Sequence, residues 1–153
     1  MKWPQNSIVV HWQKAFIISA SVILILTGTA KVVSTFGKAE VLNLADPIFG
    51  IPFRNLMLLT GLVELITALF CIFNANQKLN EYCIIWIVVN FVLYRVGLKC
   101  VGWHRPCSCL GNITGAIGLS PQRADLIMTW VLAYLVAGIA AILINKQLNI
   151  NSR

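Results

Sequence analysis

The sequence predicts an all-α protein, a four-helix transmembrane bundle that forms a single membrane domain over residues 1–153. The chain is 58% hydrophobic and only 11% charged, and its mean hydropathy is +0.79. Both values depart strongly from the composition of an average soluble domain. The apolar residues also fall into long runs, which polar segments rich in turn-forming residues separate.

A helix needs roughly 17–25 apolar residues to cross the hydrocarbon core of a bilayer. On this basis the predicted spans are about 15–33, 56–73, 83–98 and 124–144, the third being the shortest. The first run also has features of a cleaved signal peptide, with Gly28-Thr29-Ala30 as a small-residue cleavage site. The long region before this run favours a retained span.

Three connections join the predicted spans. Residues 34–55 alternate turn formers such as Gly37 and Pro52 with bulky apolar groups, which indicates a loop or short helix at the mouth of the bundle, partly in the interface. A short polar turn over residues 74–81 predicts that the second and third spans are antiparallel neighbours. Residues 99–123 form a cysteine-containing loop between the third and fourth spans.

The basic residues are typical of a membrane protein rather than a nucleic-acid-binding protein. The net charge is +7, but the 12 Lys and Arg residues are scattered through the chain, so we expect contact with the lipid bilayer and none with nucleic acid. Four spans place both termini on one side. The other side carries the excess of Lys and Arg, but this excess disappears when the intramembrane Lys31 and Arg95 are left out. Charge therefore does not decide the orientation.

Three of the five cysteines, Cys100, Cys107 and Cys109, lie in the loop after the third span. Nearby cations such as Lys99 and Arg105 favour the thiolate, which is the attacking species in thiol exchange. A disulfide between Cys107 and Cys109 would close a tight ring, and strained, exposed disulfides are labile and oxidising. The pattern favours thiol–disulfide exchange by Cys107 and Cys109, with Cys100 as a resolving third thiol.

Two alternatives remain open at this stage. Cys100, His104, Cys107 and Cys109 offer the Cys3His set that tetrahedral zinc accepts, although a single residue between the closest pair is unusual for zinc. Cuprous copper tolerates looser sulfur geometry, so metal handling is one alternative. The other is a non-catalytic membrane scaffold whose cysteines form a permanent structural disulfide.

Ionisable residues inside the apolar runs form the second feature of interest. Antiparallel packing gathers Lys31, Arg95 and Asp125 near the loop, with Glu64 deeper in the membrane. Because unpaired charge in lipid is costly, we expect Lys31 to pair with Glu64 and Arg95 with Asp125, while Arg105 in the loop completes this supporting polar cluster. The cluster is either a structural ion-pair network or a polar pocket able to hold a quinone headgroup or relay protons.

These motifs resemble those of a known family. The segment Pro106-Cys107-Ser108-Cys109-Leu110-Gly111 resembles the Cys-x-Cys-(Phe/Leu)-Gly signature of the methylamine-utilisation MauE proteins, within the wider DoxX-like group. Gly61-Leu62-Val63-Glu64-Leu65 resembles the Gly-x-x-Glu-Leu pattern of that group, and Gly28 with Lys31 resembles its first-span ending. The similarity covers nearly the whole chain, and the cysteine loop is its distinctive part.

The resemblance implies a component of a thiol–disulfide oxidoreductase in the bacterial inner membrane. Its termini would be cytoplasmic, and its loop would be periplasmic or extracellular and would work with a thioredoxin-like partner. The implied architecture is similar to that of vitamin K epoxide reductase. The sequence departs from such enzymes in having no Cys-x-x-Cys, and Cys71 and Cys83 lie at the opposite membrane face. A quinone cofactor therefore has weak support. The resemblance does not imply that the substrate is methylamine.

Overall fold

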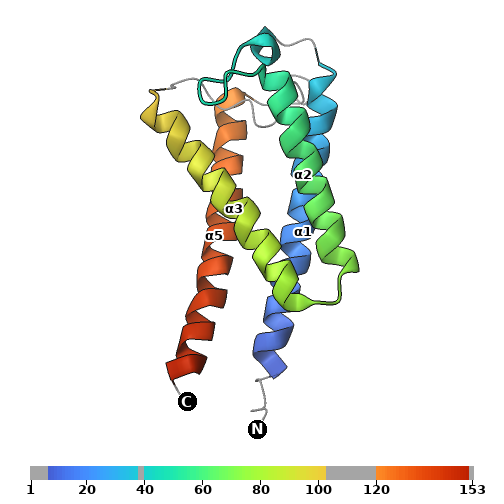
Figure 1. Cartoon of the computed structure of the whole chain (residues 1–153), viewed down its shortest axis with the longest axis vertical. Coiled ribbons are helices and arrows are strands. Elements are labelled where there is room, and N and C mark those ends of the chain that lie inside the picture. Colours follow the sequence, from blue (N-terminus) through green and yellow to red (C-terminus); the bar gives the residue numbers. More distant parts are fainter. Residues whose placement is uncertain (1–6, 38–39, 103–119, 152–153) are drawn as a thin grey trace.

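The computed structural model describes residues 7–37, 40–102 and 120–151, and within them it confirms the all-α four-helix bundle (Figure 1). The long helices are α1 (Ser7–Thr35), α2 (Phe53–Phe73), α3 (Gln77–Cys100) and α5 (Pro121–Asn151). A short 3-10 helix, η1 (Glu40–Asn43), lies between α1 and α2. The long helices alternate in direction, so both termini lie at one end of the bundle, which we call the terminal end. The opposite end is the loop end.

All four long helices are long and apolar enough to cross a membrane, which makes the chain a multi-pass membrane protein. Many large apolar side chains point outward, including Leu26 and Ile66 at 66% exposure each and Trp130 at 69%. Such a surface would be unfavourable in water and is suited to lipid. Each predicted span lies within one of these helices.

The helices extend beyond the predicted spans, most clearly at the start of α3. The residues from Gln77 to Glu81, which we expected in a polar turn, lie in the first turns of this helix. Asn76 caps the helix, because its side chain accepts a hydrogen bond from the backbone N–H of Leu79 at 3.5 Å. Hydropathy marks where a helix becomes apolar, whereas the cap determines where it begins.

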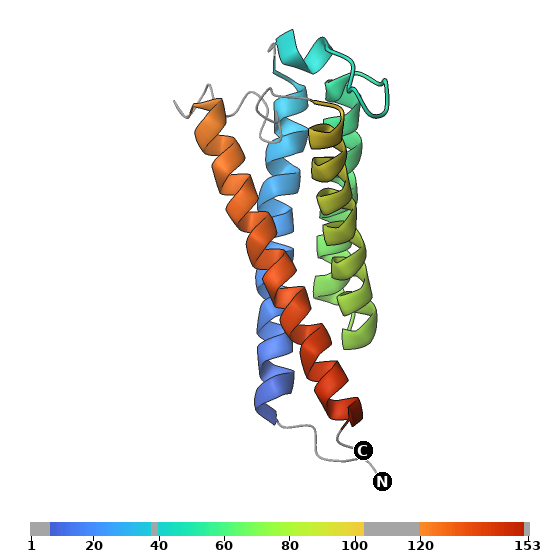
Figure 2. The same cartoon turned by 90° about the vertical axis from the view of Figure 1, so that its left-hand side faces the viewer.

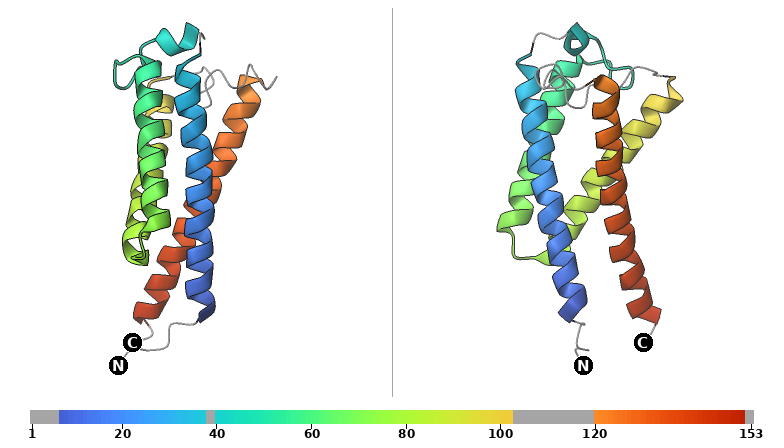
Figure 3. Two further views of the ribbon diagram at one scale, coloured as in Figure 1. Left: turned by 90° about the vertical axis from the view of Figure 1, so that its right-hand side faces the viewer. Right: turned by 180° about the vertical axis from the view of Figure 1, so that it is seen from behind.

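The helices α1 and α2 lie side by side along their length (Figures 1 and 3). Gly28 and Gly61 face each other where they pack: a Cβ atom at Gly28 would lie 2.9 Å from the carbonyl oxygen of Gly61, and one at Gly61 would lie 3.0 Å from that of Gly28. Small residues at such points allow close approach of helix backbones in membranes. The two glycines therefore bring the polar residues next to them into contact.

The tightly packed core occupies the terminal half of the bundle. Here α5 crosses over α1 (Figure 2), and the ring of Phe16 occupies the space beside Gly138, where a Cβ atom would lie 1.9 Å from it. The core contains side chains from all four long helices: Phe16, Ile17, Ala20, Leu24, Ala68, Cys71, Ile84, Ile87, Val88, Leu135 and Ile142. Towards the loop end the helices enclose a cavity.

The segment between η1 and α2 folds over the loop end, as expected for residues 34–55. Asp46 organises it: one carboxylate oxygen accepts the backbone N–H groups of Ile48 at 2.9 Å and Phe49 at 2.8 Å. Gly50 adopts a positive φ of 68° and donates its N–H to the Asp46 carbonyl at 2.8 Å. Few other residue types tolerate that conformation, so Asp46 and Gly50 together close the turn.

Candidate functional site

Of the predicted exchange cysteines, Cys100 lies within the described residues, whereas Cys107, Cys109 and the nearby Arg105 lie outside them. Cys100 is the last residue of α3, at the loop end, and it is an exposed free thiol. Its neighbour Lys99 is also exposed. The end of α3 therefore presents an accessible thiol beside a basic side chain.

The other two described thiols lie near the terminal end. Cys71 is buried in the core, and its sulfur lies 3.8 Å from the carbonyl oxygen of Asn80. Cys83 packs against the same core and is partly buried. Both are free thiols in the structure, and their position agrees with the prediction that they lie at the membrane face opposite the loop.

The predicted pairing of Lys31 with Glu64 is confirmed. The Lys31 ammonium donates to Glu64 Oε1, and the Thr27 hydroxyl donates to Glu64 Oε2 at 2.7 Å. The Lys31 side chain is 8% exposed and that of Glu64 is fully buried. The ammonium also lies 4.7 Å from the ring centroid of Phe91, within cation–π range. A buried charge of each sign is thus matched and hydrogen-bonded.

The local sequence explains why this pair forms. Lys31 follows Gly28 by three residues, and Glu64 follows Gly61 by three residues. In antiparallel helices that meet at the two glycines, each charged residue lies one turn from the crossing and on the same face. A Cβ atom at Gly61 would lie 3.1 Å from Cβ of Lys31, and one at Gly28 would lie 3.1 Å from Cβ of Glu64. The crossing thus places both side chains at the interface.

The second predicted pair, Arg95 with Asp125, is also present and joins α3 to α5. Arg95 Nη2 donates to Asp125 Oδ1 at 2.6 Å, and Nη1 donates to the Thr129 hydroxyl at 2.5 Å. The side chains are 22% and 38% exposed. Arg95 lies five residues before the end of α3 and Asp125 lies four residues after the start of α5, so this pair lies in the loop half of the bundle, as predicted.

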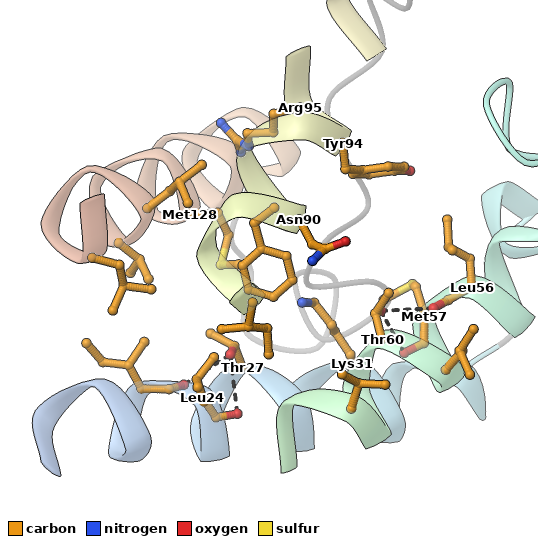
Figure 4. Close-up of a pocket in the computed structure, with 18 of the residues that line it drawn as sticks. Leu24, Thr27, Lys31, Leu56, Met57, Thr60, Asn90, Tyr94, Arg95 and Met128 are labelled. Carbon is orange, nitrogen blue, oxygen red and sulfur yellow. Dashed lines mark hydrogen bonds between the residues drawn. The ribbon is translucent and has the colours of Figure 1, made fainter. Parts of the chain in front are cut away.

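One member of each ion pair, Lys31 and Arg95, lines a single cavity in the loop half of the bundle. Its volume is about 360 Å³, and all four long helices and the segment after η1 contribute to its wall. Most of the wall is apolar, while Lys31, Asn90, Tyr94 and Arg95 are among its polar members. Figure 4 shows Lys31 from α1 and Asn90 from α3 reaching into it from different sides. A cavity therefore lies beside Lys31 and Arg95, but its wall is mainly apolar, unlike the polar pocket that was one of the two predicted forms of this cluster.

Three polar groups were not foreseen as part of this arrangement. The Tyr94 hydroxyl donates to Asp46 Oδ2 at 2.6 Å and ties α3 to the segment over the cavity. Asp46 is 1% exposed, but in the sequence its Asp-Pro pair indicates only a turn. Asn90 is a polar residue within an apolar run, and that contrast was its signal in the sequence.

At the terminal end, Lys146 pairs with Glu81. The sequence places these two residues in separate polar segments, so this pairing was not expected.

The metal-handling alternative depends on residues that the structure does not describe, apart from Cys100. Within the described ranges, no three His, Cys, Asp or Glu side chains are grouped so that they could hold a metal ion. His104, Cys107 and Cys109 lie outside these ranges. The Cys3His set therefore stays a prediction.

The fold and the site define a class: a multi-pass membrane protein with a mainly apolar cavity that is lined by one member of each of two ion pairs. No protein-family model, curated protein or solved structure matches the chain.

Proposed function

We propose that this protein exchanges thiols and disulfides at the loop end of the bundle, as a component of a thiol–disulfide oxidoreductase. Cys107 and Cys109 form the exchanging pair, and Cys100 is the third thiol. One observation supports this proposal: of the described thiols, only Cys100 is exposed, and it lies where α3 ends and the loop begins. Cys107 follows it by seven positions in the sequence.

The exchange is balanced in atoms and electrons. A thiolate of the partner protein attacks one sulfur of a Cys107–Cys109 disulfide, a mixed disulfide forms, and the other loop sulfur leaves as a thiolate. The second partner thiol then attacks the mixed disulfide and releases the first loop sulfur. Two electrons and two protons have passed from the partner dithiol to the loop. Cys100 resolves mixed disulfides that the second partner thiol does not reach.

The proposed setting follows from the resemblance to MauE and DoxX-like proteins. The termini are cytoplasmic, the loop faces the periplasmic side of a bacterial inner membrane, and the partner is a thioredoxin-like protein. An oxidising compartment suits this chemistry, because disulfides persist there. The helix arrangement is compatible with this orientation, since both termini lie at the end opposite Cys100.

The proposal is tested by trapping the mixed disulfide. In a Cys100→Ser/Cys109→Ser variant, no second loop thiol is left to displace a partner bound to Cys107, so a mixed disulfide sensitive to reductant should accumulate. The matched control is Cys83→Ser, which removes a thiol near the terminal end and should trap nothing. In intact cells, an impermeant maleimide should label Cys107 and Cys109 only after reduction.

The outcomes separate the alternatives. Replacing Cys107 and Cys109 together by serine should leave protein abundance unchanged while partner oxidation fails. A fall in abundance with normal partner oxidation would contradict the proposal and support a structural disulfide. Maleimide labelling that zinc or cuprous copper blocks and a chelator restores would instead support metal handling.

A further inference from the structure

We infer that the cavity in the loop half of the bundle binds an uncharged, lipid-soluble molecule that carries a carbonyl oxygen. Binding involves no loop cysteine, so this inference stands apart from the proposed thiol exchange. The volume of about 360 Å³ falls within the range of about 300–1,000 Å³ that is usual for small-molecule sites. Its mainly apolar wall suits a ligand that reaches the site from the lipid phase.

The charges around the cavity favour an uncharged ligand. Lys31 is neutralised by Glu64, and Arg95 is neutralised by Asp125. A charged ligand would add an unmatched charge to a region of low dielectric constant, which is costly. An uncharged ligand leaves both pairs intact.

Most polar side chains of the wall already have partners within the protein. Thr60 donates to the carbonyl oxygen of Leu56 at 2.9 Å. Thr27 donates to Glu64 and Tyr94 donates to Asp46, as described above. These groups therefore contribute to the fold, and they are poor candidates for holding a ligand.

Lys31 and Asn90 have hydrogen-bonding capacity left for a ligand. An ammonium carries three N–H donors, and the described hydrogen bond of Lys31 uses one, on Glu64. Asn90 donates its amide nitrogen to the Trp86 carbonyl at 2.8 Å, which leaves its amide oxygen as an acceptor. Both side chains line the same cavity (Figure 4). Lys31 would donate to a carbonyl oxygen, and Asn90 would accept from a hydroxyl.

The remaining wall is suited to hydrocarbon and to flat rings. Phe91, Trp86 and Phe49 provide aromatic surfaces, and Phe49 is stacked on Tyr94 with ring centroids 6.2 Å apart. Two kinds of membrane compound have the inferred chemistry. One is a quinone, and the other is a neutral glyceride with ester carbonyls.

Ligand binding to the full-length protein in detergent should raise its midpoint of thermal unfolding. The two probes are ubiquinone-1 and dioctanoylglycerol. Stabilisation by ubiquinone-1 alone identifies a quinone site, stabilisation by dioctanoylglycerol alone identifies a glyceride site, and stabilisation by both supports the shared chemistry. If neither probe raises the midpoint, the inference is overturned.

Two variants locate the effect. Val63→Trp fills the cavity and should abolish stabilisation, whereas Leu62→Trp places the same side chain at a neighbouring residue that is 44% exposed and does not line the cavity. Asn90→Leu removes the polar group at nearly constant volume and should raise the Kd of the hydroxyl-bearing dioctanoylglycerol, or of reduced ubiquinone-1, about 5- to 10-fold. If Val63→Trp does not fold, the Kd of Asn90→Leu alone tests the inferred site. Equal effects of both tryptophan variants, or an unchanged Kd in Asn90→Leu, would contradict the inferred site.

Discussion

The Lys31 and Glu64 side chains place opposite charges within two transmembrane helices, Lys31 near the loop end of α1 and Glu64 near the middle of α2. Their exposure of 8% and 0% means that neither has an alternative partner in water. Removing one member of a buried pair leaves the other charge uncompensated, and this is more destabilising than never having had the pair. Thr27 adds a hydrogen bond to Glu64, so the carboxylate has partners on both oxygens.

Glu64→Gln should lower the free energy of unfolding by about 3–5 kcal/mol, because the Lys31 ammonium then lies buried without a counter-charge. The measurement is unfolding of the purified protein in mixed micelles. The double variant Lys31→Met/Glu64→Leu should lose less free energy of unfolding than Glu64→Gln alone, because it leaves no unpaired charge. Lys14→Gln is the control, since Lys14 is exposed on the same helix as Lys31 and should change little. Equal losses at Lys14 and Glu64 would contradict a role for the pair.

The hydroxyl group of Tyr94 links helix α3 to the segment between η1 and α2. Its hydroxyl donates to Asp46, whose other carboxylate oxygen holds the turn at Ile48 and Phe49. A hydrogen bond to a charged group contributes about 1.5–3 kcal/mol. The bond therefore holds the segment over the cavity in place.

Tyr94→Phe should loosen this segment while keeping the stacked ring. Hydrogen exchange at the amides of Ile48 and Phe49 should become faster by about 10-fold or more, since that factor corresponds to about 1.4 kcal/mol. Tyr82→Phe is the matched control, because Tyr82 is 64% exposed on the same helix. Unchanged exchange in Tyr94→Phe would show that the hydroxyl contributes nothing to the closed segment.

At the scale of elements, close packing joins α1 to α2, and the two glycines at their crossing make it possible. Alanine normally favours a helix over glycine by about 0.8–1 kcal/mol. At Gly28 and Gly61 the added methyl group would meet the backbone of the other helix at 2.9 Å and 3.0 Å. Backbone cannot move aside as a flexible side chain can, so packing outweighs propensity there.

Gly28→Ala and Gly61→Ala should each lower the free energy of unfolding by about 1–3 kcal/mol through overpacking. Gly97→Ala is the control within the same protein. Its added methyl group would meet Cδ1 of Ile48 at 2.9 Å, which is the end of a flexible side chain. The free energy of unfolding of this variant should be unchanged or rise by up to about 1 kcal/mol. A similar loss at all three positions would contradict the tight crossing.

At the scale of the whole molecule, the bundle is divided into a packed terminal half and a hollow loop half. The core cluster lies in the terminal half, and the cavity lies under the end of α3 that carries Cys100. The described thiols follow the same division. Cys100 is exposed at the loop end, whereas Cys71 and Cys83 lie towards the other membrane face.

Single-cysteine variants test the proposed orientation. In intact cells, an impermeant maleimide should label a variant that retains only Cys100, and it should label a variant that retains only Cys83 after permeabilisation. Cys71 is buried and serves as the unreactive control. The reverse order of labelling would place the loop end in the cytoplasm and would overturn the proposed periplasmic exchange.

Much of this arrangement could be predicted from residues that act locally. Apolar runs predicted the four spans, since a helix is the structure that satisfies its own backbone hydrogen bonds in lipid. The same cost of isolated charge in lipid predicted the pairs Lys31–Glu64 and Arg95–Asp125. The pairing of Lys146 with Glu81 was missed, because both residues lie in polar stretches where no burial is expected.

Hydropathy and charge determined by themselves how many helices cross the membrane and which intramembrane charges must meet, because the energy of each group in lipid depends mainly on its own chemistry. Only the tertiary structure decided that Gly28 and Gly61 meet, that Tyr94 holds Asp46, and that a cavity remains between the helices. Those features depend on how the helices tilt and fit together. The tilt and fit of the helices depend on many contacts between distant parts of the chain, so they cannot be read from any single run of residues.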